Sequence, residues 1–385
     1  MDFDVLLPVS HTVLSHNALL HKQTLGKTLK IHTDKEGLPD LEEVKIALFG
    51  VNEWRYPSSK FQHRTDTSAL RIQFYKLYTG NWSIAMADLG DIREGETPED
   101  TDYAVQSLVS SLHKAGILPL IIGGSQEITY ATYRAFDKVS NMVNIVSVDS
   151  SFDFSFQEEL ISAHSYMGRI IIEPPNNLFN FCNLGYQTYY NAQEAIDLID
   201  SLFFESYRLG EIINDIAIVE PVLRDADIVS IDMTSVKSAE LGHTEHAYSN
   251  GFNSREICAI CRYAGISDRV SVFGVYECEN SNPSHQLIAQ MLWYFIEGYN
   301  FRTREHPFNK TNNATKFIVP VDNETLIFYK SDISGRWWVE VPSLLKSNNK
   351  LETPALLPCT HQDYLDACNQ IIPQRWWKAY RKFMN

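Results

Sequence analysis

Short runs of consecutive hydrophobic residues recur along the first three quarters of the chain, and amphipathic segments separate them. The runs are KIALFGV (45–51), WSIAMADLG (82–90), LPLIIGG (118–124), VNIVSVD (143–149), ADIVSIDM (226–233) and SVFGVYE (271–277). Such continuous hydrophobicity is typical of strands that are covered on both faces of a parallel sheet. The alternation with amphipathic segments predicts an α/β fold of three layers, αβα, with a central, mostly parallel sheet.

Some of the intervening segments carry signals that begin helices. Thr97 and Pro98 supply an N-cap and a first-turn proline, and an apolar stripe with i, i+3, i+4, i+7 spacing follows them. Asn253 and Glu256 have the spacing of a capping box. A further helix is predicted for residues 192–208, where apolar residues again recur with helical spacing.

The pattern changes after residue 310. KFIVPV, TLIFYK and RWWVEVP predict an antiparallel meander, and RWWKAYRKFM predicts a final helix. We therefore expect three parts: an N-terminal segment (1–40) packed on the main domain, an α/β domain (41–310) and an aromatic-rich C-terminal extension (311–385). Four of the seven tryptophans lie in the extension. We expect most of them to attach it to the main domain, and the alternative is that they anchor a partner.

Composition narrows the class of protein. A chain of 385 residues with 44% hydrophobic and 21% charged residues is typical of a soluble globular protein. The net charge of −15 argues against a nucleic-acid partner or an anionic membrane, because phosphates would be repelled. The N-terminus has no basic region typical of a secretory signal, and no apolar run approaches the roughly 20 residues that span a bilayer.

The cysteines indicate a reducing compartment. Six of them are scattered along the chain, too sparsely for a disulfide-stapled scaffold, so we expect a cytoplasmic protein. Cys258 and Cys261 form a CxxC inside a helical pattern with no second pair nearby. We expect these two to be buried thiols, and zinc or redox chemistry is the alternative.

Polar residues stand where several of the predicted strands end. GGSQE, VDSSFDF and SIDMTSVKS each close a hydrophobic run and carry Gln126, Asp149, Asp153 and Asp232, and a fourth strand end supplies Glu277. Ligands of open parallel sheets bind outside the carboxyl ends of the strands. We therefore expect these side chains to converge at one edge of the sheet.

In order and spacing these motifs resemble those of the ureohydrolases, the family of arginase, agmatinase and formimidoylglutamase. The family motifs read GGDHS, DAHxD and SxDxDxxDP, with a later strand end that bears glutamate, and the resemblance covers roughly residues 40–305. It implies an arginase-like fold and hydrolysis of a non-peptide C–N bond in a linear amidine. Two manganese ions that share a hydroxide would supply the nucleophile. The resemblance also implies self-association, because family members commonly form trimers or hexamers.

Carried over residue by residue, the metal-binding motifs are degenerate. Gln126 stands at the histidine of GGDHS, Ser151 at the histidine of DAHxD, and Thr234 at the second ligand aspartate of the third motif. The ligand positions that the chain retains are Asp149, Asp153 and Asp232. Both histidine ligands and one aspartate are therefore lost, which predicts that the binuclear manganese site does not form.

The losses are uneven between the two metals. The resemblance assigns one metal to the positions of Gln126, Asp149, Asp153 and Asp232, a set that still offers three carboxylates and an amide oxygen. We expect no cofactor, and the alternative is one divalent cation (Mn²⁺, Mg²⁺ or Ca²⁺) at this remnant set. The other metal would depend on the hydroxyls of Ser151 and Thr234, which are feeble ligands.

Two catalytic positions of the family are also matched. The resemblance assigns His164, in SAHSYMG, to the histidine that shuttles protons near the substrate. It assigns Glu277 to the carboxylate that faces the guanidinium in arginase-like members. A loop histidine and a carboxylate that caps a helix or pairs with a lysine are the alternatives for these two residues.

These features predict a ureohydrolase-fold pseudoenzyme that is catalytically inactive and acts as a binding or scaffold protein. Its partner would be another protein or a second copy of the chain, with neither nucleic acid nor membrane. The alternative is an active hydrolase of an amidine-like substrate of the formimidoylglutamate, agmatine or arginine type, with a single metal or none. A dinucleotide-binding α/β protein is disfavoured, since no GxGxxG follows the first strand.

Overall fold

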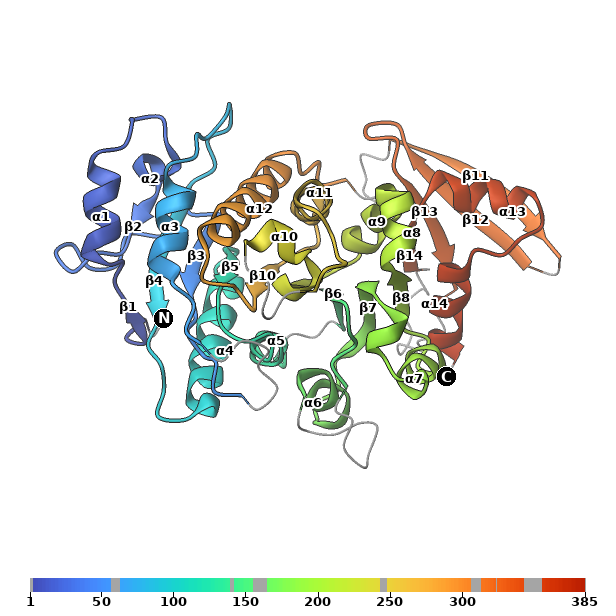
Figure 1. The fold of residues 1–385 in the computed structure, drawn as a ribbon. Helices are drawn as coiled ribbons and strands as arrows, with labels where there is room; N and C mark the ends of the chain where they lie inside the picture. The colour runs from blue at the N-terminus through green and yellow to red at the C-terminus, as the bar shows by residue number, and fades with distance from the viewer. Residues whose placement is uncertain are drawn as a thin grey trace.

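Two β-sheets organise the molecule (Figure 1). The computed structural model describes residues 3–56, 63–138, 142–154, 165–242, 248–305, 313–322, 324–342 and 355–384. The strands of the large sheet are β1 (Leu6–Leu7), β2 (Lys30–Ile31), β3 (Ile46–Gly50), β4 (Met86–Ile92), β5 (Leu118–Ile122), β6 (Val143–Val148), β7 (Leu178–Tyr186), β8 (Glu205–Arg208), β9 (Ile228–Asp232) and β10 (Val272–Tyr276). Their order is β1-β4-β3-β5-β10-β9-β6-β7-β8, and β2 also pairs with β4. Only β1 runs antiparallel to its described neighbour.

Helices cover both faces of the large sheet. One face packs against α1 (His11–Ala18), α2 (Leu25–Thr28), α3 (Thr67–Tyr75), α8 (Leu209–Asn214), α9 (Val219–Arg224), α10 (Ser238–Leu241), α11 (Ser254–Ile266) and α12 (Asn282–Asn300). The other face packs against α4 (Pro98–Lys114), α5 (Ile128–Arg134), α6 (Tyr166–Ile172) and α7 (Gln193–Ser201).

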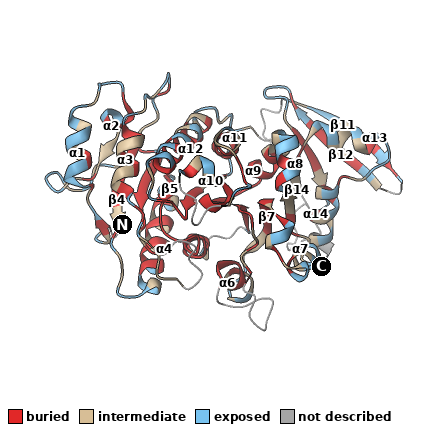
Figure 2. Ribbon diagram, viewed as in Figure 1, coloured by how far each residue is buried: buried red, intermediate tan, exposed pale blue. Residues whose placement is uncertain are grey.

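The central strands are buried on both sides (Figure 2). Successive side chains of a strand point to opposite faces, so Leu48 joins one hydrophobic core and its neighbour Phe49 joins the other. The three-layer αβα fold with a mostly parallel sheet is therefore confirmed. The six predicted strands correspond to β3, β4, β5, β6, β9 and β10.

The predicted helix over residues 192–208 is too long. Helix α7 ends at Ser201, Phe203 adopts a left-handed φ of 55°, and the chain then enters β8, where Glu205 pairs with Cys182 of β7. Pairing with a strand from elsewhere in the chain overrides the local helical pattern at this point. The N-cap at Thr97 and the capping box at Asn253 form as predicted, and Asp100 completes a capping box at Thr97 as well.

The C-terminal region forms a second sheet in the order β11-β12-β13-β14, and all of its pairs are antiparallel. Its elements are β11 (Ala314–Val321), β12 (Glu324–Ser331), β13 (Trp337–Val341), β14 (Ala355–Cys359), α13 (His361–Cys368) and α14 (Gln374–Met384). The meander and the final helix are as predicted, whereas β14 was not predicted. The division into the parts 1–40, 41–310 and 311–385 stays a prediction.

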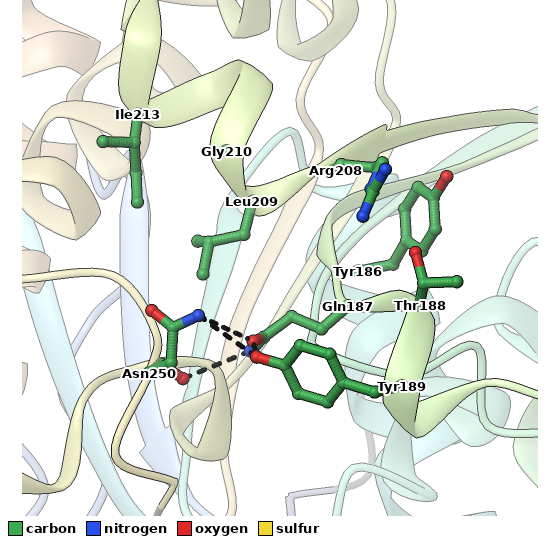
Figure 3. A pocket seen from close by; sticks show the side chains of 9 residues that line it. All are labelled: Tyr186, Gln187, Thr188, Tyr189, Arg208, Leu209, Gly210, Ile213 and Asn250. Atoms are coloured by element: carbon green, nitrogen blue, oxygen red, sulfur yellow. Dashed lines mark hydrogen bonds between the residues drawn. The ribbon is translucent and has the colours of Figure 1, made fainter.

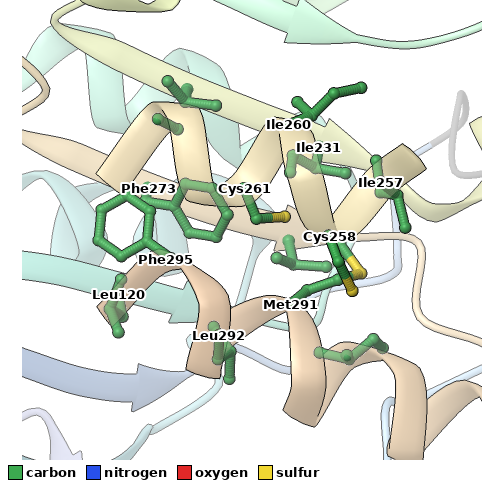
Figure 4. Close-up of a cluster of buried hydrophobic side chains, with 14 of the residues drawn as sticks. Leu120, Ile231, Ile257, Cys258, Ile260, Cys261, Phe273, Met291, Leu292 and Phe295 are labelled. Atoms are coloured by element: carbon green, nitrogen blue, oxygen red, sulfur yellow. The ribbon is translucent and has the colours of Figure 1, made fainter. Parts of the chain in front are cut away.

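The CxxC motif lies in the hydrophobic core (Figure 4). Cys258 and Cys261 are on α11 and face the side of α12 that carries Met291, Leu292 and Phe295. Burial raises the pKa of the Cys258 thiol to about 12, so a thiolate is disfavoured there. The expectation of buried thiols is confirmed. Within the described part of the chain, no helix is both long enough and apolar enough to span a bilayer.

Charged side chains join the C-terminal region to the large sheet. Arg375 of α14 pairs with Glu205 of the edge strand β8 at 2.6 Å, and both side chains are largely buried. Arg224 of α9 lies 4.4 Å from the ring centre of Trp338. Trp337 and Trp376 belong to the core of the extension, and Trp377 is 42% exposed.

We expect Arg375→Met to lower the free energy of unfolding by about 3–5 kcal/mol, because the change leaves the Glu205 carboxylate buried without its partner. The exposed Arg381 of the same helix provides the control, and Arg381→Met should change stability by about 0.5 kcal/mol or less. Urea denaturation of the two variants measures the difference. Equal losses would contradict a special role for the Arg375–Glu205 pair.

A second buried ionic cluster joins the segment after β3 to two helices. The hydroxyl of Tyr56 donates to Asp102 of α4, and Arg169 of α6 donates to the same carboxylate at 3.4 Å. Burial raises the pKa of Asp102 from its ordinary value of 3.8 to about 6, although both donors act to lower it. The folded protein therefore binds this proton more tightly than the unfolded chain does.

Stability should depend on pH through Asp102. Since its folded-state pKa is raised, the cost of its charge is present above pH 6 and is relieved as the pH falls toward 4. Relative to Asp102→Asn, the wild-type protein should gain about 1 kcal/mol of unfolding free energy between pH 7 and pH 5. Denaturation curves of both proteins at the two pH values measure this difference. Parallel pH dependences would contradict the raised pKa.

Candidate functional site

The predicted polar residues lie at the carboxyl ends of four strands that are neighbours in the sheet, β5, β10, β9 and β6. Gln126 follows β5, Glu277 follows β10, Asp232 ends β9 and Asp149 follows β6. Parallel neighbours end at the same edge, so the strand order places these side chains together. Gly123 and Gly124 make the turn after β5 with φ of 84° and 76°, which glycine adopts without strain.

Three carboxylates converge at this edge. Asp149, Asp153 and Asp232 each place one oxygen within 4.8 Å of the others, and Asp149 and Asp232 are fully buried. The other oxygen of each carboxylate accepts a hydrogen bond from a nearby residue. The bonds to these Oδ1 atoms are Ser151 N to Asp149 at 3.0 Å, Thr234 N to Asp232 at 2.6 Å and Ser151 Oγ to Asp153 at 2.7 Å. Local turn geometry therefore fixes the direction in which the carboxylates point.

The side-chain amide of Gln126 lies in the centre of this cluster, and Gln126 is only 3% exposed. With its nitrogen turned inward, the amide donates to the Oδ2 atoms of Asp149 (2.8 Å), Asp153 (2.8 Å) and Asp232 (3.2 Å). Its oxygen then accepts from Ser147 Oγ at 3.0 Å. With the oxygen turned inward, four oxygen atoms face one another and Nε2 donates to Ser147 Oγ instead.

The two orientations have different requirements. Four converging oxygens repel one another, and a cation between them would relieve that repulsion, whereas an inward nitrogen offers two hydrogens to the carboxylates without a cation. A single hard cation would fit Gln126 Oε1 and the three carboxylates only in the oxygen-inward orientation. The hydrogen-bonding network favours the nitrogen, which differs from the expectation that Gln126 offers an amide oxygen.

The residues present do not fit a binuclear manganese centre. Ser151, at a histidine position of the family motif, uses its hydroxyl to donate to Asp153. The hydroxyl of Thr234, at an aspartate position, is buried and has no hydrogen-bond partner among the described residues. A neutral hydroxyl is a weaker ligand for Mn²⁺ than an imidazole or a carboxylate. No step through two metals is therefore assigned to this site.

Glu277 is held against the turn that carries Gln126. It is 3% exposed, its φ is 50°, and its backbone nitrogen donates to Gly124 O at 2.9 Å. Its Oε1 accepts from the backbone nitrogen of Gln126 at 3.2 Å. A left-handed backbone is uncommon for glutamate. Its role opposite a guanidinium stays a prediction, and His164 lies outside the described residues.

A pocket beside the cluster was not predicted from the sequence (Figure 3). This cavity of about 190 Å³ lies at the carboxyl ends of β7 and β8. Its wall includes Gln187, whose backbone nitrogen donates to Ser150 O, next to Asp149. The side-chain amide of Asn250 donates to Gln187 Oε1 and Tyr189 OH, each at 3.1 Å. Leu209 and Ile213 add apolar surface to the wall, and no short motif in the sequence predicts this pocket.

The comparisons with known proteins agree with this fold. The Arginase family model matches residues 48–295. A search of curated proteins finds no significant match. The formiminoglutamase of Trypanosoma cruzi, solved with Mn²⁺, is 18% identical with a TM-score of 0.61 over 72% of this chain and 99% of that one.

Two further solved structures share the fold. The formimidoylglutamase of Bacillus subtilis is 17% identical, with a TM-score of 0.59 over 69% of this chain and 90% of that one. The agmatine ureohydrolase of Thermoplasma volcanium is 20% identical, with a TM-score of 0.57 over 76% and 99%. The family model covers more than half of the chain, and these structures have the same architecture. The chain therefore belongs to the arginase family.

Proposed function

We propose that this member of the arginase family is a pseudoenzyme, which keeps the ureohydrolase scaffold without a binuclear manganese centre and acts by binding. The observation that carries the proposal is the Gln126 amide, whose inward atom lies 2.8–3.2 Å from three carboxylates where the family motif places a metal-binding histidine, so that a nitrogen there meets only acceptors. An amide nitrogen has no lone pair to offer a metal, and its hydrogens point at the carboxylates.

The chemistry of the family explains why these substitutions matter. Hydrolysis of an amidine near neutral pH needs hydroxide, and metal coordination supplies it by lowering the pKa of bound water. Ser151 and Thr234 leave the second metal with hydroxyl groups, and Ser151 is already engaged with Asp153. Without two cations, the cluster has no means of generating the bridging nucleophile.

The partner in this proposal is a protein, either a different one or a second copy of the chain. Helix α14 presents Trp377, 42% exposed, with the guanidinium of Arg381 5.0 Å from the centre of its ring. Tryptophan and arginine are the residue types that most often anchor protein interfaces. Six free cysteines suit a reducing compartment, so the cytoplasm is part of the proposal.

An active hydrolase with a single metal or none is the second candidate. Retention of Asp149, Asp153 and Asp232 together with the buried Glu277 favours it, because these acids still line one edge of the sheet. A substrate of the formimidoylglutamate, agmatine or arginine type would fit this candidate. Activity assays separate the two functions.

We expect the purified protein to release no measurable product from arginine, agmatine or formimidoylglutamate in excess Mn²⁺. The combined variant Gln126→His, Ser151→His and Thr234→Asp restores the missing ligand types, and it should bind more Mn²⁺ than the wild type by elemental analysis after dialysis. Asp149→Ala in the wild-type background serves as the control. Turnover that Asp149→Ala abolishes would overturn the pseudoenzyme and favour the second candidate.

A further inference from the structure

We infer that the Gln126 side chain is an internal replacement for the cation, so that the three aspartates stay together without metal. With the nitrogen inward, it takes the central position of the acidic cluster, within 2.8–3.2 Å of all three carboxylates, which share its two hydrogens. The inference goes beyond the proposed function, because it would hold for a metal-free hydrolase as well as for a pseudoenzyme.

The two oxygens of each carboxylate have different partners, which supports this role of Gln126. Each aspartate uses Oδ1 for a local donor, which is the backbone of Ser151, the backbone of Thr234 or the hydroxyl of Ser151. Each then has Oδ2 directed at the Gln126 nitrogen. Every carboxylate thus has a local donor on one side and faces the shared hydrogens of the amide on the other, and charged acceptors make the stronger class of hydrogen bond.

The end of the Gln126 amide that points away from the carboxylates faces Ser147. Ser147 of β6 lies 3.0 Å from the outward end of the amide, and its Oγ accepts a hydrogen bond from Tyr166 OH at 3.3 Å. Ser147 accepts that hydrogen bond with one lone pair, and its own hydroxyl hydrogen can be donated to Gln126 Oε1. This contact is compatible with an outward oxygen, and the three carboxylates on the inner side favour the inward nitrogen.

Other side chains at this position would need a cation or lose the contacts. A glutamate of nearly the same shape would add a fourth carboxylate and remove both amide hydrogens, so a divalent cation would be needed to hold the cluster. A leucine would fill the volume without any donor. Glutamine is therefore the residue that makes the cluster independent of metal.

The test compares thermal unfolding in EDTA with unfolding in millimolar Mn²⁺ or Ca²⁺. The wild-type melting temperature should differ by less than about 1 °C between these conditions. Gln126→Glu should melt about 5 °C lower in EDTA and regain most of that loss when either cation is added. The control is Gln187→Glu, which places a carboxylate at another buried glutamine outside the acidic cluster and should gain no dependence on cations.

Further measurements keep the outcome clear if Gln126→Glu fails to fold. Gln126→Leu should melt below the wild type and be partly rescued by cations, and wild-type protein dialysed without EDTA should carry no stoichiometric metal. A wild-type protein that holds one Mn²⁺ per chain and melts higher with it would overturn the inference. So would a Gln126→Glu variant that ignores cations. Turnover without metal would contradict the proposed pseudoenzyme but would not contradict the proposal that Gln126 replaces the cation.

Discussion

The structure depends on one electrostatic constraint, which is that three carboxylates must share a small volume at the carboxyl edge of the sheet. The strand order β5-β10-β9-β6 and the turns after these strands create that constraint, since Asp149 and Asp232 are fixed by backbone donors two residues further on. Such a cluster is stable only if positive charge or hydrogen-bond donors converge on it. The identity of the group at the centre of the cluster therefore decides what the fold can do.

A cation and an amide satisfy this constraint with different chemical consequences. A cation binds the carboxylates and also polarises water, whereas an amide nitrogen binds the carboxylates and leaves water unactivated. Ser151 acts in the same direction, because its hydroxyl donates to Asp153 from a position where the family motif has a ligand lone pair. Two of the substitutions thus place donors where a metal would need acceptors. Stability without metal and loss of hydrolysis would follow from the same atoms.

The sequence predicts the parts of this arrangement that depend on local pattern. Strands β3, β5, β6, β9 and β10 are recognised because apolar residues predominate in their runs. Strand β7 is missed because Asn180 and Asn183 interrupt its run, and their side-chain nitrogens donate to Glu205 and to Ser151 O, each at 2.8 Å. The site likewise has parts that depend on local pattern and parts that do not. The motifs locate Gln126 and the aspartates, but the direction of the amide depends on Ser147 and Tyr166, which belong to no motif.

The C-terminal extension lies at the β8 edge of the large sheet, and it bears on whether the protein is a scaffold or a catalyst. Strand β8 is an edge strand of four residues, and α14 lies over it, with Arg375 on Glu205 and Lys378 donating to Phe204 O at 2.7 Å. Edge strands left open invite pairing with other chains, and these two contacts place α14 beside this edge. A partner that bound α14 would recognise the C-terminal extension (residues 311–385) and would not need the acidic cluster. Binding at α14 is therefore compatible with either a cation or the Gln126 amide at the centre of the cluster. Only the cluster itself distinguishes a scaffold from a catalyst.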